Sequence, residues 1–270
     1  MSRVHQALKK AEREKMGGGI SHEEHSVEVE EHSPEESSVD QRLIALLDPG
    51  SSAAEQFRKL RTSILEHSSS NPPRCILITS SVPGEGKTVT AVNLAVSLAR
   101  GVDEHVLLMD ADLRRPSLHK YLGLNPVSGL SNYLTDNIEL SDLLIKTSVP
   151  KLTFLPAGPV SDKASELFSS DRMRNLIEEA RSRYEDRYII IDSTPAMGTS
   201  EPDILSRQVD GVILVVKAGK TPREVIKRSL LSLDKEKILG VVFNDVDFRT
   251  TGYHYGYYGY YSYYGKEEKK

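Results

Sequence analysis

Residues 75–99 read CILITSSVPGEGKTVTAVNLAVSLA. This stretch predicts a buried strand, a loop that contains Gly84 and Gly86, and then a helix, which is the context of a phosphate-binding loop. The two glycines let backbone N–H groups approach phosphate oxygens closely, and the start of the helix adds a partial positive charge. Ser81 stands where the GxxxxGK[ST] pattern has its first glycine, so the sequence predicts a variant of that loop.

Two side chains of the loop suit a nucleotide that carries a magnesium ion. Lys87 can reach the β- and γ-phosphates, and the hydroxyl of Thr88 can be a ligand of Mg²⁺. ATP and Mg²⁺ are therefore the expected cofactors. The residues expected to contact the nucleotide here are Pro83, Gly84, Glu85, Gly86, Lys87, Thr88 and Val89.

Strands and helices alternate along the chain around this loop. Apolar runs that suit buried strands lie at 75–79, 105–109, 152–155, 188–191, 211–216 and 238–243. Helical spacing is present at 52–66, 87–100, 171–185 and 222–234, and shorter helices are expected at 129–135 and 139–146. Short strands that are buried on both faces and alternate with helices indicate an α/β domain with a doubly wound, mostly parallel sheet.

Charged side chains follow two of these strands at the point where each strand ends. Asp110 and Asp112 lie in the segment DADLRRP, and Asp192 ends the run YIIID. Ligands of open α/β sheets bind at this edge. We expect Asp112 and Asp192 to position Mg²⁺, and Asp110 to accept the proton of an attacking hydroxyl, although Asp112 could exchange roles with it. Arg114 and Arg115 could support the phosphate during its transfer or bind an acidic neighbour.

The last predicted strand ends at Asn244. Its amide could hydrogen-bond the edge of a purine, and a turn-forming asparagine is the alternative.

Composition excludes several classes of protein. The chain has 270 residues and a formal net charge of -4, which suits one domain with tails and argues against a protein built mainly to bind nucleic acid. Its single cysteine, Cys75, excludes an internal disulfide and is expected in the core. No apolar run approaches the roughly 20 residues needed to cross a bilayer, and the N-terminus has no signal-peptide core. We expect a cytoplasmic protein without direct membrane insertion, which reaches the inner face of the membrane through a partner.

The two ends of the chain differ from its middle. Residues 1–42 are expected to form a polar N-terminal helix and an acidic linker, residues 43–247 the folded domain, and residues 248–270 a flexible tail. The tail contains the run YHYGYYGYYSYY, which has the period of neither a strand nor a helix, so its phenols should be exposed. The candidate phosphate acceptors are Tyr253, Tyr255, Tyr257, Tyr258, Tyr260, Tyr261, Tyr263 and Tyr264.

The helix predicted ahead of the first strand carries a charged motif. Glu55, Arg58 and Arg61 are spaced by three residues and should share one face of the helix. They could form complementary charge pairs with a neighbouring subunit. A solvated face with internal salt bridges is the alternative.

Residues 50–264 resemble the bacterial tyrosine kinases. The loop SSVPGEGKT, the segment DADLRRP with the strand before it, and the segment IIIDSTP are similar, in this order, to the three nucleotide motifs of that family. The family uses a variant P-loop ATPase fold, of the type also found in septum- and plasmid-positioning ATPases, to phosphorylate tyrosine. Its members carry an ExxRxxR motif that forms the subunit interface of a ring, and a tyrosine cluster that is autophosphorylated.

The resemblance also implies a setting and partners. The N-terminal SRVHQALKKAERE is similar to the start of stand-alone members found beside exopolysaccharide genes. The implied protein is an autokinase that regulates exopolysaccharide synthesis or export and assembles with copies of itself into a ring, with an octamer as the candidate. Phosphoryl transfer between subunits, a membrane polysaccharide chain-length regulator as activator and an opposing tyrosine phosphatase are further implications.

Two other functions compete with this interpretation. A regulatory ATPase of the septum- or plasmid-positioning type would share the loop variant, but such proteins usually have a lysine early in the loop, where this chain has Ser81 and Val82. The tyrosine run could instead stack on nucleic acid or bind other copies of itself. Residues 253–264 contain no Lys or Arg to follow a phosphate backbone, so of these two only adhesion between tails stays open.

Overall fold

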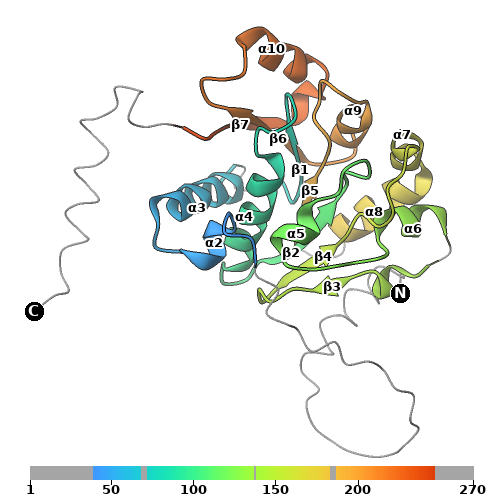
Figure 1. Ribbon diagram of the computed structural model, residues 1–270. Helices are drawn as coiled ribbons and strands as arrows, with labels where there is room; N and C mark the ends of the chain where they lie inside the picture. The colour runs from blue at the N-terminus through green and yellow to red at the C-terminus, as the bar shows by residue number, and fades with distance from the viewer. Residues whose placement is uncertain (1–38, 68–71, 137, 183–186, 247–270) are drawn as a thin grey trace, which may run out of the picture.

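A computed structural model describes residues 39–67, 72–136, 138–182 and 187–246 (Figure 1). The predicted N-terminal helix and the tyrosine run lie outside these residues. The described part contains one sheet with strand order β3-β4-β2-β5-β1-β6-β7. The strands are β1 Cys75–Ser80, β2 His105–Asp110, β3 Ile145–Lys146, β4 Leu152–Leu155, β5 Arg187–Asp192, β6 Gly211–Lys217 and β7 Ile238–Asn244.

The central strands are parallel and buried on both faces, as predicted. Strand β1 pairs with β5 on one side and with β6 on the other. Its residues alternate between two cores: Cys75 and Leu77 face one, and Ile76 and Ile78 face the other. All four are fully buried, and each large apolar side chain contributes about 1.5–3 kcal/mol by leaving water. The expected core position of Cys75 is therefore confirmed.

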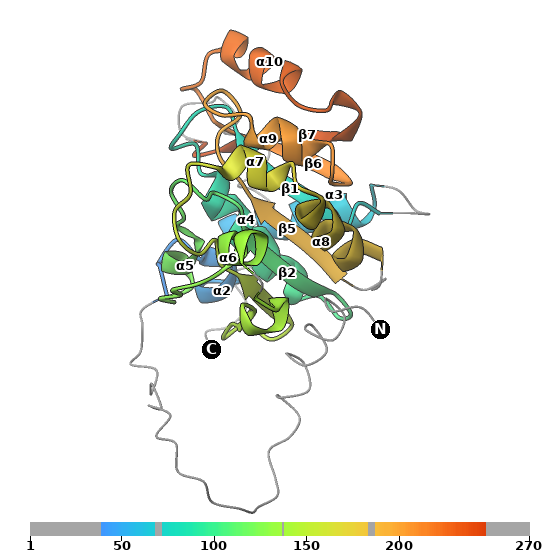
Figure 2. The same cartoon turned by 90° about the vertical axis from the view of Figure 1, so that its right-hand side faces the viewer.

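Helices cover both faces of the sheet. In the views of Figures 1 and 2, α2, α3 and α4 lie on one side, and α7 and α8 lie on the other. The helices are α2 Ile44–Leu47, α3 Ser52–Leu65, α4 Lys87–Ala99, α5 Leu118–Tyr121, α6 Leu130–Thr135, α7 Ala164–Phe168, α8 Asp171–Ser182, α9 Glu201–Ser206 and α10 Arg223–Leu231. The doubly wound, mostly parallel α/β fold is confirmed. None of these helices is long and apolar enough to span a bilayer.

The prediction of a helix at 139–146 was wrong. The chain there forms one 3-10 turn, Leu140–Asp142, and then the short strand β3, which pairs antiparallel with β4 at the edge of the sheet. A single turn already buries Leu140 and Leu143, which gave the segment its helical spacing. The free edge of β4 then offers backbone hydrogen bonds to the residues that follow. The very short helices α2, α5, α7 and α9 were not expected, because four to six residues are too few to show the helical spacing of apolar side chains.

The carboxyl ends of the parallel strands meet at one edge of the sheet. The loop 81–86 lies there, between β1 and α4, and β1 stands between β5 and β6 in the strand order. The segments that follow β2 and β5 flank it on one side, and those that follow β6 and β7 flank it on the other. The fold therefore brings all predicted nucleotide motifs to one edge.

Candidate functional site

The phosphate loop depends on its two glycines. Gly84 and Gly86 have φ values of 82° and 94°, a region that L-residues rarely adopt. A Cβ on Gly86 would also lie 2.0 Å from Nδ2 of Asn244. Ser81 is not among the residues with positive φ, so the position of the missing first glycine does not require one. The serine is consistent with a working loop.

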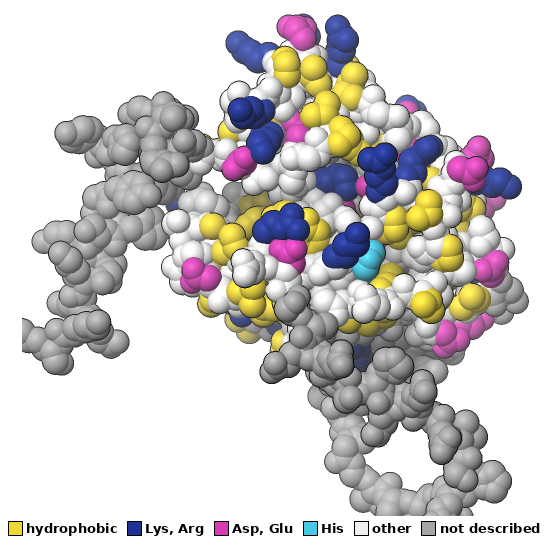
Figure 3. Space-filling model, viewed as in Figure 1, with side chains coloured by type: hydrophobic (Ala, Val, Ile, Leu, Met, Phe, Trp, Pro, Cys, Tyr) yellow, Lys and Arg dark blue, Asp and Glu magenta, His cyan; other side chains and the backbone are white. Residues whose placement is uncertain are grey.

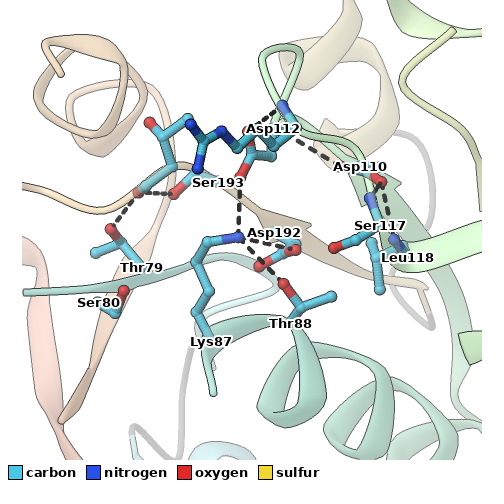
Figure 4. Close-up of polar contacts among 12 residues, drawn as sticks. Thr79, Ser80, Lys87, Thr88, Asp110, Asp112, Ser117, Leu118, Asp192 and Ser193 are labelled. Atoms are coloured by element: carbon cyan, nitrogen blue, oxygen red, sulfur yellow. Dashed lines mark hydrogen bonds and ion pairs between the residues drawn. The ribbon is translucent and has the colours of Figure 1, made fainter. Parts of the chain in front are cut away.

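Lys87 joins the three predicted motifs (Figure 4). Its Nζ lies 3.1 Å from Oδ2 of Asp112 and 3.5 Å from Oδ2 of Asp192. It also donates a hydrogen bond of 3.1 Å to the hydroxyl of Thr88. Burial disfavours the charged ammonium, but the charges of Asp192 and Asp112 outweigh this and raise the pKa of Lys87. The lysine is therefore a largely, but not fully, buried cation between two carboxylates.

Asp192 is the most deeply buried acid of this group. Its side chain is fully buried, and burial raises its pKa to about 6 against the opposing charge of Lys87. Its Oδ1 has no hydrogen-bond partner among the described residues. A buried carboxylate oxygen without a partner is costly unless a ligand satisfies it. Asp192 is therefore prepared for a cation or a donor that the described residues do not supply.

Asp110 uses both carboxylate oxygens within its own loop. Oδ1 accepts the N–H of Asp112 at 3.2 Å, and Oδ2 accepts the N–H groups of Ser117 and Leu118 at 3.1 Å each. Burial, together with the charge of Asp192, raises the pKa of Asp110 to about 7, although the backbone donors oppose this. Of the two carboxylates weighed as proton acceptor, Asp112 contacts Lys87, and Asp110 is turned toward residues 112–118 (Figure 4).

Arg114 is held by an acid that the sequence analysis missed. Its Nε donates a hydrogen bond of 2.8 Å to Oε1 of Glu201, the first residue of α9. The Glu201 side chain is fully buried, whereas that of Arg114 is 44% exposed. The pair connects the segment after β2 to the segment after β5. The sequence did not indicate that Glu201 would pair with Arg114, because the two residues are 87 positions apart.

The other side of the loop is occupied by Glu85 and Asn244. Nδ2 of Asn244 donates a hydrogen bond of 2.9 Å to the carbonyl oxygen of Glu85. The amide predicted to contact a purine thus contacts the loop, and the purine contact stays a prediction. The Glu85 side chain, expected among the nucleotide contacts, is only 2% exposed and turns inward.

A small cavity and a basic surface lie near this part of the loop. The cavity has a volume of about 210 Å³ and lies between Pro83 and the start of α10. Figure 3 shows Lys and Arg side chains on the part of the face that includes α10. Exposed basic residues here are Lys220, Arg223, Lys227 and Arg228. Such a surface attracts anions.

The charged motif on α3 lies away from the phosphate loop. Arg61 donates a hydrogen bond of 2.9 Å to the carbonyl oxygen of Ser97, near the far end of α4 and about 15 Å along that helix from Lys87. Glu55 and Arg58 form an ion pair with each other. Within one chain, all three side chains therefore have internal partners.

The oxygen ligands at the loop suit Mg²⁺. The described residues contain no group of three or more His, Cys, Asp or Glu that could enclose a metal ion by itself. Mg²⁺ sites of nucleotide enzymes need only one or two carboxylates, with waters and phosphate oxygens completing the shell. Asp112, Asp192 and the Thr88 hydroxyl meet that requirement.

Known proteins are similar to this chain in sequence and fold. A family model described as an AAA domain matches residues 73–234. The tyrosine-protein kinase YwqD of Bacillus subtilis is 35% identical over 210 residues, which cover 77% of this chain and 87% of the relative. The putative tyrosine-protein kinase CapB of Staphylococcus aureus is 32% identical over 212 residues, covering 77% and 92%.

Solved structures agree with these relatives. The kinase domain of the Escherichia coli tyrosine kinase ETK superposes with a TM-score of 0.72 at 32% identity, covering 80% of this chain and 84% of that one. A ParA family ATPase from Chlorobium tepidum superposes less well, with a TM-score of 0.51 at 26% identity over 66% of this chain and 78% of that one. The P-loop ATPase fold is therefore shared with the positioning ATPases, but the kinases are the nearer group. The chain belongs to the bacterial tyrosine-protein kinases and is an ATP-dependent protein-tyrosine kinase.

Proposed function

We propose that the chain is an autokinase, which transfers the γ-phosphoryl group of Mg-ATP to the tyrosine cluster 253–264 of a neighbouring subunit. The observation that carries this proposal is the meeting of Lys87, Asp112 and Asp192 from three separate motifs. The tyrosine cluster supplies acceptors in the same polypeptide. Nucleotide site and substrate are thus parts of one chain.

The proposed roles follow from the chemistry of phosphoryl transfer. When bound, Mg²⁺ neutralises charge on the β- and γ-phosphates and aligns them. Thr88, Asp112 and Asp192 would hold it. Lys87 and the loop N–H groups stabilise negative charge on the phosphoryl oxygens, and a triphosphate competes with the two carboxylates for the lysine. Arg114 adds a second positive charge.

The acceptor phenol loses its proton as its oxygen bonds to the γ-phosphorus. The bond from that phosphorus to the bridging oxygen breaks, and ADP leaves. Asp110, whose pKa is raised to about 7, is the proposed proton acceptor. Asp112, which is buried beside Lys87, could exchange roles with it and would then leave the metal to Thr88 and Asp192. The amide of Asn244 remains the candidate purine contact.

The tail can reach a second active site. Residues 248–264 would span roughly 55 Å when extended, at about 3.3 Å per residue. That length allows transfer between subunits, and it also allows transfer within one subunit. Mixing a Lys87→Met chain with an active chain that lacks residues 253–264 separates the two. Phosphotyrosine on the Lys87→Met chain supports transfer between subunits, and an unlabelled mixture contradicts it.

The proposed assembly is a ring of subunits, with an octamer as the candidate. Glu55, Arg58 and Arg61 would form its contacts by exchanging their internal partners for those of a neighbour. A membrane polysaccharide chain-length regulator would activate the kinase at the inner face of the membrane, and a tyrosine phosphatase would oppose it. The regulated process would be exopolysaccharide synthesis or export.

Phosphorylation of the tail should loosen this assembly. Each phosphotyrosine adds about -1.5 to -2 charges, so eight add about -12 to -16 to a chain with a formal net charge of -4. Tails that gather around one ring would then repel each other. Sedimentation of phosphorylated and dephosphorylated samples should give a smaller assembly for the phosphorylated one. Equal masses would contradict this.

Incubation with Mg-ATP followed by detection of phosphotyrosine tests the proposal. The unaltered chain should be labelled, whereas Lys87→Met and a chain without residues 253–264 should not. A regulatory ATPase would hydrolyse ATP and leave tyrosine unmodified, even with the activator present. That result would replace the autokinase with the alternative function.

A further inference from the structure

The Glu85 side chain connects the phosphate loop to a distant loop. Its Oε2 accepts the N–H of Val82 at 2.8 Å. Its Oε1 accepts the N–H of Lys217 at 3.3 Å and also the hydroxyl of Thr221. The partners 217 and 221 are separated from Glu85 by 132 and 136 residues. We call this group of three hydrogen bonds the Glu85 tether.

Phosphate binding by itself does not explain this side chain. The loop offers phosphates its backbone N–H groups, and position 85 is one of the unspecified positions of the GxxxxGK[ST] pattern. Burying an unpaired carboxylate would cost several kcal/mol, yet Glu85 is only 2% exposed. Three donors offset that cost, and all three belong to the two loops that the carboxylate joins. The Glu85 carboxylate therefore makes its hydrogen bonds with the protein and is shielded from solvent.

The Glu85 tether lies between two glycines, the residues whose backbone has the most conformational freedom. Glu85 stands between Gly84 and Gly86, whose freedom of backbone rotation has an entropic cost when the loop is fixed. From the other side, Asn244 donates to the carbonyl oxygen of Glu85, and its own carbonyl oxygen accepts the N–H of Ala218. Loops 81–86 and 217–221 and the end of β7 are therefore joined by hydrogen bonds between groups of the protein itself.

We propose that Glu85 is a positioning residue, whose carboxylate fixes the phosphate loop against residues 217–221 in the geometry that accepts the nucleotide phosphates. The inference rests on the nucleotide-binding role of the loop. Restraint before binding lowers the entropic cost of binding, so the tether should act on nucleotide affinity more than on the chemical step. It also makes Thr221, on a loop outside the three motifs, a determinant of nucleotide affinity.

Calorimetric titration with Mg-ADP tests the tether. Glu85→Ala should weaken binding about tenfold, the effect of losing charge-assisted hydrogen bonds worth about 1.4 kcal/mol together. Thr221→Val should weaken it about threefold, and Thr221→Ser, which keeps the hydroxyl, should stay within about twofold of the unaltered chain. Glu224→Gln is the matched control, because Glu224 is exposed on the adjacent helix α10 and should behave as the unaltered chain.

Kinetics and hydrogen exchange separate positioning from general stability. KM for ATP should rise in Glu85→Ala and Thr221→Val, with kcat changed less than about threefold. Without nucleotide, the backbone amides of Val82, Glu85 and the two glycines of the loop should exchange faster in Thr221→Val than in Thr221→Ser. Equal affinities and equal exchange in the two Thr221 variants would overturn the inference, even if Glu85→Ala failed to fold.

Two measurements on the unaltered chain, Mg-ADP binding and tail phosphorylation, show whether the positioning role of Glu85 or the proposed autokinase activity has failed. If the chain binds Mg-ADP but phosphorylates no tail tyrosine, the autokinase proposal fails and the tether can still be measured. If the unaltered chain does not bind Mg-ADP, both are overturned.

Discussion

The two flanks of the phosphate loop differ in how their buried carboxylates are partnered. On the flank formed by β2 and β5, one oxygen of Asp192 has no partner within the described part of the chain, and the pKa values of Asp110 and Asp192 are raised. On the flank formed by β6 and β7, both oxygens of Glu85 accept hydrogen bonds from the protein. Unsatisfied buried charge is typical of a site that awaits a ligand, and satisfied charge is typical of a fixed scaffold. One flank is suited to chemistry and the other to positioning.

Of the substitutions on the two flanks, we expect a change at Lys87 to have the largest effect on the rate of tyrosine phosphorylation. Lys87→Met removes the cation that faces the phosphates and leaves Asp112 and Asp192 without their shared partner. We expect the initial rate of tyrosine phosphorylation to fall by about a thousandfold or more. Radiolabel transfer from ATP measures it. Lys227→Met, an exposed lysine of α10, is the control and should keep its rate. A Lys87→Met rate within tenfold would contradict the role of this flank.

The Arg114–Glu201 pair should respond unequally to loss of each partner. Arg114→Ala removes the cationic partner of a fully buried carboxylate and should lower the free energy of unfolding by about 2–4 kcal/mol. Glu201→Gln leaves an arginine that can turn to water, and should cost about 1 kcal/mol. Urea denaturation measures both. Equal losses would mean that the pair behaves as an exposed surface contact.

The raised pKa values predict a pH dependence of stability without nucleotide and metal. An unfolded aspartate has a pKa of about 3.9, whereas Asp192 and Asp110 titrate in the fold at about 6 and about 7. The folded chain therefore binds more protons between these values, and this contribution to stability is lost as the pH rises from about 4 to about 7.

Thermal unfolding from pH 5 to pH 8 checks this slope. Asp192→Asn should reduce the loss of stability over that range by on the order of 2 kcal/mol. Asp162→Asn, an exposed aspartate before α7, is the control and should leave the slope unchanged. A slope that is equal in Asp192→Asn and in the unaltered chain would contradict the assignment.

The smallest effect should come from Asn244, on the positioning flank. Asn244→Ala removes one hydrogen bond to the loop and should weaken ATP binding by about 1 kcal/mol. If Asn244 only holds the loop, ATP and GTP affinities should fall by the same factor. If it also contacts the purine, the ratio of the two affinities should change. Fluorescence titration with both nucleotides distinguishes these outcomes.

Local patterns predicted most of the sheet and the content of the site. The strands at 75–79, 105–109, 152–155 and 211–216 lie within or coincide with β1, β2, β4 and β6, because buried parallel strands are continuous apolar runs. The helix expected at 139–146 was wrong, because the spacing of a few leucines cannot distinguish one turn from a longer helix. Glu201 and Thr221 were missed, since their partners are distant in sequence.

By itself, the sequence determined which chemistry the chain carries. The glycines at 84 and 86 let the loop approach phosphate groups. The lysine, and the acids that follow the strands, are expected at the same edge of a parallel sheet, where the carboxyl ends of its strands lie. The partners of those groups became known from the folded chain: Lys87 lies between two acids, Arg114 pairs with Glu201, and Glu85 accepts a hydrogen bond from Thr221. Such contacts join segments that are far apart in the sequence, and the local spacing of residues does not show which distant segments will meet.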